Sequence, residues 1–157
     1  MLRLGLFVLS LMAAVPASAE ETAFRAGAWR GNAYFEGGYF SHCAVRARYA
    51  KGDTLSFAIN RNGQLVVRVG NPDWTLPVAR TVDFMLQVDR RAPILRQVQP
   101  KEAHEIATVF PAPDELFPQM EEGRRLSITI GLRRESYSLA DTSGAIAALR
   151  RCAQRYG

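Results

Sequence analysis

Apolar and polar residues alternate with a period of two along most of this chain, as in β-strands that bury one face and expose the other. The alternation is clearest in segments 82–88 and 126–132. It also runs through segments 43–49, 55–59 and 65–69, which short turns containing glycine separate. Weaker signals at 29–35, 94–98, 105–110 and 137–139 add further strands. The pattern predicts a mainly-β fold, a single antiparallel β-sandwich or curved sheet of seven to nine strands.

Two segments follow helical spacing instead. A short helix is predicted near 114–120, with Asp114 as a candidate N-cap and Pro118 limiting it to about two turns. A C-terminal helix is predicted from about 143 to 154, where apolar residues recur on one face. Its candidate caps are Asp141, Thr142 and Ser143.

The turn at residues 61–63 fixes a strand register. A two-residue turn would place Phe57 opposite Arg68, on the same face as a charge. A three-residue loop with Gly63 in the left-handed conformation instead pairs Phe57 with Val67 and Ile59 with Leu65 on the buried side. We therefore expect the three-residue loop.

The same register argument, applied to the turn of residues 51–53, predicts a cluster of basic residues on the exposed face of the sheet. It places Arg48, Ser56 and Arg68 in one row across the exposed face, with Arg46 one row along. The whole chain carries a formal net charge of +5, which favours anionic neighbours such as phosphates and acidic glycans. A basic excess also serves solubility, so the alternative is that these arginines are only solvated.

The N-terminus has the features of a secretory signal peptide. Arg3 precedes a short apolar run, and small residues at 16–19 fit a cleavage site. We expect residues 1–19 to be removed, leaving residues 20–157 as one β-rich domain with no transmembrane segment. The expected location is the periplasm or the exterior of a bacterial cell.

Two cysteines remain after this cleavage, Cys43 and Cys152. An even number in an oxidising compartment predicts a disulfide between them, and no redox-active CxxC is present. His42 and His104 would complete a metal site with these cysteines, but the spacing matches no zinc pattern. No metal or other cofactor is therefore expected.

No catalytic motif stands out. The segment 141–145 resembles the Asp-Thr/Ser-Gly-Ala signature of retroviral-type aspartic proteases, but an extra residue intervenes and a helix follows, so helix capping is the better interpretation. An envelope-acting hydrolase remains the alternative. It would need a serine or carboxylate within about 3 Å of His42 or His104.

Aromatic residues crowd the glycine-rich segment 29–40, and Trp74 lies in a predicted turn. Exposed rings of this kind bind sugars or peptides, so Trp74 joins Arg46, Arg48 and Arg68 as a candidate binding residue. The alternative is that segment 29–35 is a strand whose rings fill the core. A flat apolar patch around Trp29, Tyr39 and Trp74 would instead indicate a subunit of an envelope assembly.

A family resemblance covers residues 115–150. It consists of Met-Glu-Glu-Gly-Arg at 120–124, the strand at 126–130, Tyr-Ser-Leu at 137–139 and Ala-Ile-Ala-Ala-Leu at 145–149. This region resembles the C-terminal part of the invasion-associated locus B family of small proteobacterial periplasmic proteins. The resemblance implies an all-β periplasmic domain with an envelope or host-interaction role and no known catalysis. The family's central cysteine pair is missing here, and the resemblance assigns no functional residue.

These features together predict a non-enzymatic periplasmic binding or envelope-associated protein. Its expected partner is an anionic envelope component or another envelope protein. Nucleic acid is not expected, because an exported protein rarely meets it and no basic-aromatic recognition motif is present.

Overall fold

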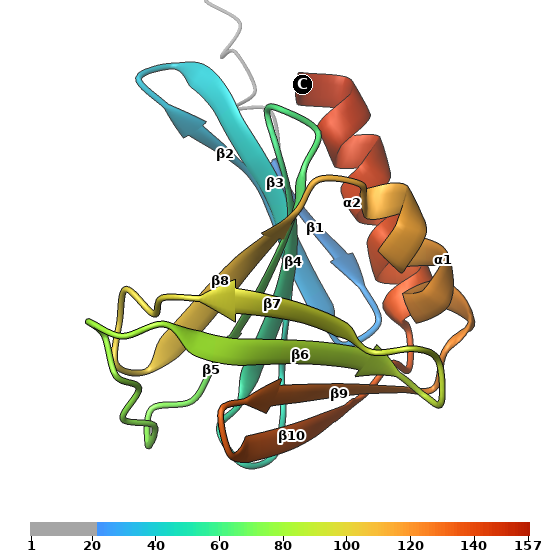
Figure 1. Cartoon of the computed structure of the whole chain (residues 1–157). Coiled ribbons are helices and arrows are strands. Elements are labelled where there is room, and N and C mark those ends of the chain that lie inside the picture. Colours follow the sequence, from blue (N-terminus) through green and yellow to red (C-terminus); the bar gives the residue numbers. More distant parts are fainter. Residues whose placement is uncertain (1–21) are drawn as a thin grey trace, which may run out of the picture.

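The computed structural model describes residues 22–157, which form two antiparallel sheets and two helices (Figure 1). The predicted signal peptide, residues 1–19, lies outside the described residues. The six-stranded sheet contains, in spatial order, β1 (Ala23–Ala26), β2 (Trp29–Glu36), β3 (Tyr39–Arg48), β4 (Thr54–Asn60), β5 (Leu65–Gly70) and β8 (Glu105–Phe110). The four-stranded sheet contains β10 (Arg133–Ser138), β9 (Arg125–Ile130), β6 (Val82–Val88) and β7 (Ile94–Val98). The predicted mainly-β fold with two helices is confirmed.

The core lies on the inner face of the six-stranded sheet. Helix α2 (Thr142–Tyr156) contacts β1 to β4 on this face, and the four-stranded sheet shares the same buried cluster (Figure 1). Trp29 stacks on Phe57 with ring centroids 5.2 Å apart, and both rings are buried. Burying one such large side chain contributes about 1.5–3 kcal/mol. Segment 29–35 is a strand, as predicted, but of its rings only Trp29 lies in the core, since Tyr34 and Phe35 are exposed.

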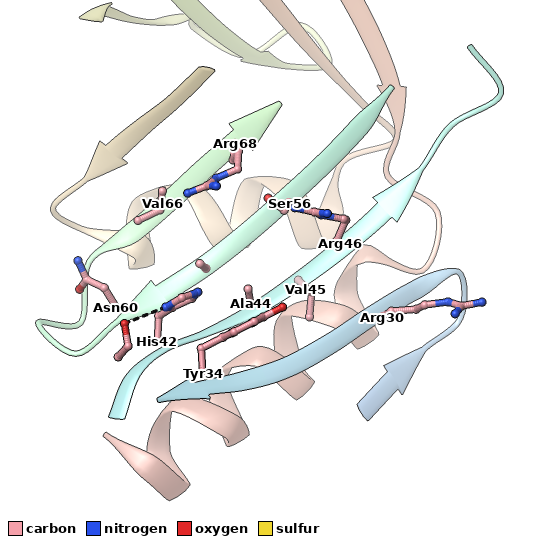
Figure 2. A pocket seen from close by; sticks show the side chains of 12 residues that line it. Arg30, Tyr34, His42, Ala44, Val45, Arg46, Ser56, Asn60, Val66 and Arg68 are labelled. Atoms are coloured by element: carbon pink, nitrogen blue, oxygen red, sulfur yellow. Dashed lines mark hydrogen bonds between the residues drawn. The ribbon is translucent and has the colours of Figure 1, made fainter. Parts of the chain in front are cut away.

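The outer face of the six-stranded sheet carries no layer of helices or strands among the described residues. Figure 2 views this face, with both helices behind the sheet. Its outward residues alternate with the buried ones along each strand, as the period-two pattern requires.

The β4–β5 hairpin has the predicted register. Phe57 lies opposite Val67 and Ile59 opposite Leu65, and Gly63 has a φ of 72°. The side chain of Asn60 fixes the loop, because its Oδ1 accepts hydrogen bonds from the backbone N–H groups of residues 62 and 64, each at 3.0 Å.

The predicted register of the β3–β4 hairpin is wrong by two residues. Arg48 lies opposite Thr54, so Arg46 rather than Arg48 faces Ser56. The turn is centred at Lys51, one residue earlier than expected, since the N–H of Tyr49 donates to the carbonyl of Asp53 at 2.9 Å and the N–H of Gly52 donates to that of Tyr49 at 3.0 Å. The buried carboxylate of Asp53 accepts a hydrogen bond of 2.6 Å from Asn71 Nδ2. Turn spacing alone carries no sign of that buried contact.

The predicted disulfide is confirmed. Cys43 on β3 is bonded to Cys152 on α2, with their Cα atoms 6.1 Å apart. The bridge joins residues separated by 109 positions, and in the chain-entropy account a loop of this size contributes about 4–5 kcal/mol.

The predicted cap and length of the first helix are wrong. Helix α1 (Pro113–Glu122) begins one residue before Asp114, and its N-cap is Ala112, which has no capping side chain. Pro113 presets the backbone of the first turn, and the Asp114 carboxylate lies there as a charge that complements the helix dipole. The helix continues past Pro118, because Leu116, Phe117 and Met120 are buried on both sides of it.

Helix α2 is longer than predicted. It runs from Thr142 to Tyr156, and Asp141 occupies the N-cap position with a φ of 61°. Its side chain makes no capping hydrogen bond.

The strand predicted at 126–132 is shorter than expected. Strand β9 ends at Ile130, and Leu132 is fully exposed in the turn that follows.

Candidate functional site

Four arginines form one line across the outer face of the six-stranded sheet. Arg25 on β1 lies opposite Arg30 on β2, which lies opposite Arg46 on β3. Arg46 faces Ser56 on β4, which faces Arg68 on β5. We call Arg25, Arg30, Arg46 and Arg68 the arginine row. Neighbouring strands are about 4.8 Å apart, so the row extends over about 19 Å, at right angles to the strands.

The row concentrates positive charge that its surroundings neutralise only at Arg68. Arg68 donates a 2.9 Å hydrogen bond to Glu105. Within residues 22–157, no carboxylate lies within ion-pair distance of Arg25, Arg30 or Arg46. Like charges directly opposite each other on neighbouring strands destabilise a sheet. The arrangement therefore lowers the stability of the sheet. It also leaves the guanidinium groups of Arg25, Arg30 and Arg46 without a carboxylate partner.

The side chains of the arginine row point in different directions. Figure 2 shows Arg46 reaching over Ser56 toward β5, whereas Arg30 reaches the opposite way, toward β1. Ser56 is buried although it belongs to the outer face, since it lies between Arg46 and Arg68. This divergence leaves each guanidinium accessible.

A hollow of about 360 Å³ lies beside the row, within the size range of small-ligand sites. Ala44 and Val66 lie between its two ends (Figure 2), and Ala58 lies opposite both of them on the strand between. Its polar lining comes from the arginines at one end and from Tyr34, Ser41, His42 and Asn60 at the other. The hollow therefore joins a cationic end to an aromatic and amide end.

The aromatic end is built on a β-bulge. Tyr34 pairs with His42 and Phe35 with Phe40, so Ser41 is the extra residue on β3. The rings of Tyr34 and His42 stack, with centroids 4.5 Å apart and planes 9° from parallel. The bulge brings the Ser41 hydroxyl within 3.1 Å of His42 Nδ1.

A short hydrogen-bond chain orients His42. The Ser41 hydroxyl donates to Glu36 Oε1 at 3.1 Å, so it accepts from His42 Nδ1–H. Burial lowers the pKa of His42, the positive charge of Arg68 lowers it further, and Glu36 partly opposes them. The neutral ring then carries its free lone pair on Nε2.

The structure brings together two of the predicted basic residues. Arg46 and Arg68 share the row and both line the hollow. Arg48 lies one row further along, opposite Thr54, outside the lining of the hollow. The predicted row of Arg48, Ser56 and Arg68 is therefore corrected to one of Arg46, Ser56 and Arg68.

The expectation of an exposed Trp74 is wrong. Its side chain is only 2% exposed, because the indole ring packs into the core, with the Arg133 guanidinium 5.4 Å from the ring centroid. Trp29 is buried as well, so the expected flat patch around Trp29, Tyr39 and Trp74 reduces to the exposed Tyr39.

Sequence reasoning missed Arg25, Arg30, Tyr34 and His42 as members of this face. Arg30 and Tyr34 do alternate with buried residues on β2, a signal that the surrounding glycines and aromatics obscure. Nothing in the local sequence marks the bulge at Ser41.

The groups around the two histidines do not form a catalytic triad. Ser41 donates its proton to Glu36 rather than to His42, so the histidine does not act as a base toward this serine. His104 Nδ1 lies 2.7 Å from the carbonyl oxygen of Trp74. The condition set for the hydrolase alternative is met in distance alone: Ser41 Oγ lies 3.1 Å from His42 Nδ1 at the aromatic end of the hollow, and its own hydrogen bond is directed at Glu36.

A second hollow, of about 300 Å³, lies where the two sheets meet. It is lined by Lys51, Asp53, Asn71, Asp73, Trp74, Arg133 and Glu135. Asn71 anchors this region, since its Nδ2 also donates to the carbonyl of Lys51 at 3.0 Å and its Oδ1 accepts from the N–H of Asp73 at 2.8 Å. These contacts assign the cluster a structural role in holding the β3–β4 loop.

Metal ligands do not gather in the described part of the chain. No group of three or more His, Cys, Asp or Glu side chains is placed to hold a metal ion there. The disulfide also uses both thiols of the metal site considered above.

Neither described helix is long and apolar enough to cross a membrane.

The fold and the site define a class: a small two-sheet β domain, clamped by one disulfide, with an open basic sheet face. The crystal structure of invasion associated protein B from Bartonella henselae has a similar fold, with a TM-score of 0.63 and 17% identity. The match covers 86% of this chain and 99% of that one. No family model and no curated protein matches the sequence. The resemblance noted for residues 115–150 is thus confirmed, and as a likeness of fold it extends over most of the chain.

Proposed function

We propose that this protein is a non-enzymatic binding protein of the bacterial envelope, which holds an anionic envelope component on the arginine row. One observation carries the proposal. Arg25, Arg30 and Arg46 lie on adjacent strands without a carboxylate partner among the described residues, and two of them, Arg30 and Arg46, line an open hollow. Guanidinium groups bind carboxylates and phosphates through paired hydrogen bonds, so this face is suited to anions.

The periplasm is the proposed location. The leader-like residues 1–19 support export, and the disulfide between Cys43 and Cys152 is of the kind that persists in oxidising compartments. The likeness of fold to an invasion associated protein supports an envelope role. Cell fractionation and N-terminal sequencing test the location, with Glu20 as the expected first residue. Recovery of the uncleaved chain from the cytosol would overturn it.

Binding must use several arginines together. One solvent-exposed ion pair contributes only about 0–1 kcal/mol, so a single contact gives little affinity. An anion on the row also relieves the repulsion between Arg30 and Arg46, and this relief adds to the attraction. Affinity is therefore expected to fall as salt is raised, because mobile ions screen exposed charges.

The experiment compares two variants of equal net charge. In the test variant, Arg30, Arg46 and Arg68 become Gln. In the control variant, Arg90, Arg134 and Arg151, exposed arginines away from this face, become Gln. Co-sedimentation with isolated envelope fragments should fall at least tenfold for the test variant only. Unchanged retention of the test variant, with its fold verified by circular dichroism, would overturn the proposal.

A further inference from the structure

The arginine row is linear, and this shape distinguishes between anions. Arg25, Arg30 and Arg46 lie on three neighbouring strands, and Arg68 lies two strands beyond Arg46. At about 4.8 Å per strand, the Cα atoms of the four arginines fall near 0, 5, 10 and 19 Å along one line. A single phosphate or carboxylate reaches only part of such a line. A chain that carries repeated negative charges matches all of it.

The position of the row within the sheet argues against a peptide partner. Extended peptides bind sheets mainly by adding a strand at a free edge, where backbone groups are unpaired. The hollow instead lies over β2 to β5, whose backbones pair on both sides. Recognition here must come from side chains alone.

The surface beside the row fits sugar rings. Ala44, Ala58 and Val66 offer small apolar side chains on which the C–H faces of a pyranose ring can lie. The Asn60 amide borders the aromatic end, where its Oδ1 accepts two backbone N–H groups and its Nδ2 donates to Gln64 Oε1, which leaves one amide N–H for a ligand.

A nucleic acid strand fits this surface less well. Single-stranded nucleic acids bind through aromatic side chains on which successive bases stack. The two aromatic rings beside the hollow, Tyr34 and His42, stack on each other instead.

We infer that the anionic component is an acidic polysaccharide strand, which crosses the β-strands along Arg25, Arg30, Arg46 and Arg68. This inference rests on the proposed function and names its ligand class. The carboxylate or phosphate groups of the polymer pair with the row, and its sugar rings lie over the apolar residues of the hollow. Affinity then increases with oligomer length until the chain spans the row.

Isothermal titration with oligogalacturonates of two, four, six and eight residues tests the inference. Their fully methyl-esterified forms are the matched controls, since they keep the sugar backbone and lack the charge. We expect affinity to rise with length and the esters to bind at least tenfold more weakly. Equal affinity of the dimer and the octamer, or of acids and esters, would contradict the linear site.

A second comparison locates the polymer on the row. Arg25→Gln removes the charge at its far end, outside the lining of the hollow. It should weaken binding of the octamer several-fold and leave the dimer unchanged. Arg134→Gln is the control for loss of one charge, and it should affect neither. An octamer that is indifferent to Arg25→Gln counts against a ligand that spans the row.

Phosphatidylglycerol vesicles and oligo-dT separate this inference from the proposed function. If row variants lose vesicle binding while oligogalacturonates never bind, the polysaccharide is wrong and anion binding on this face stands. Oligo-dT that binds as tightly as the octamer also contradicts the polysaccharide. If no variant of the row changes binding to vesicles, oligogalacturonates or envelope fragments, both proposals fail.

Discussion

Arg30 and Arg46 lie directly opposite each other on β2 and β3, and neither has a carboxylate partner within residues 22–157. Such a pair opposes sheet formation, because two cations on neighbouring strands repel each other. The pair sits on the accessible face, beside the hollow that Tyr34 and His42 complete.

Removal of one member of this pair should stabilise the protein. Arg30→Gln is expected to raise the free energy of unfolding by about 0.2–1 kcal/mol at low salt, since cross-strand pairs have effects of this size. The gain should shrink as salt screens the charges. Urea denaturation at two salt concentrations measures it, with Arg134→Gln as the control. A fall in stability for Arg30→Gln would show that the repulsion is absent.

The disulfide should account for a large share of the stability. Cys43 is fully buried, so we choose Cys43→Ala with Cys152→Ala, which leaves no polar group in the core. The double variant is expected to lose about 2–5 kcal/mol of unfolding free energy. Urea denaturation of the oxidised protein and the variant gives the difference. Reduction of the unmodified protein is the independent check, and two free thiols in the native protein would contradict the bridge.

Protonation of His42 should destabilise the fold. Its pKa in the folded protein is lower than the ordinary value of 6.5, chiefly because burial disfavours the charged ring. Stability from this residue is therefore fully present above about pH 6.5 and is lost as the pH falls through the lowered folded-state pKa. Unfolding free energies measured from pH 8 to pH 5 should show this loss. His42→Gln should flatten this part of the curve. An unchanged curve in His42→Gln would remove His42 as its source.

Gly31 should be intolerant of any side chain. A Cβ atom at this position would overlap the ring of Phe24, the residue opposite it on β1. Gly31→Ala is expected to lower the free energy of unfolding by about 1–3 kcal/mol, as overpacking does. Gly144→Ala is the contrast, since a Cβ there would meet only Ala26 at 3.8 Å and α2 would gain about 0.5–1 kcal/mol. Thermal unfolding of both variants tests the pair, and similar melting temperatures would contradict the expected contrast.

The period-two pattern predicted most strands, because a sheet with one buried face imposes that alternation on the sequence. It also predicted the register of the β4–β5 hairpin, since a shift by one residue would have placed Arg68 on the buried side. The prediction for the β3–β4 hairpin failed because the turn is centred at Lys51 and not at Gly52. Asp53, which follows that turn, is held by a buried hydrogen bond from Asn71, 18 positions away, and local spacing carries no sign of this contact.

Local sequence also misplaced Trp74, which follows a proline-containing turn typical of the surface. Its ring is buried because Arg133 of the distant β10 lies against it.

The start of α1 also differs from the prediction, which made Asp114 the N-cap. Pro113 at the first helical position starts the helix without the side chain of Asp114, and the buried residues around Pro118 extend it.

The sequence by itself determined the strand segments, the C-terminal helix and the one available cysteine pairing, since these follow from periodicity along the chain and from a count of two thiols. Only the tertiary structure decided which arginines share a line. The order of β1, β2, β3, β4 and β5 in the sheet, together with the position of the β3–β4 turn, brings Arg25, Arg30, Arg46 and Arg68 into register. Neighbours across a sheet are set by hydrogen bonding between distant segments, and side-chain spacing along one strand carries no record of that pairing.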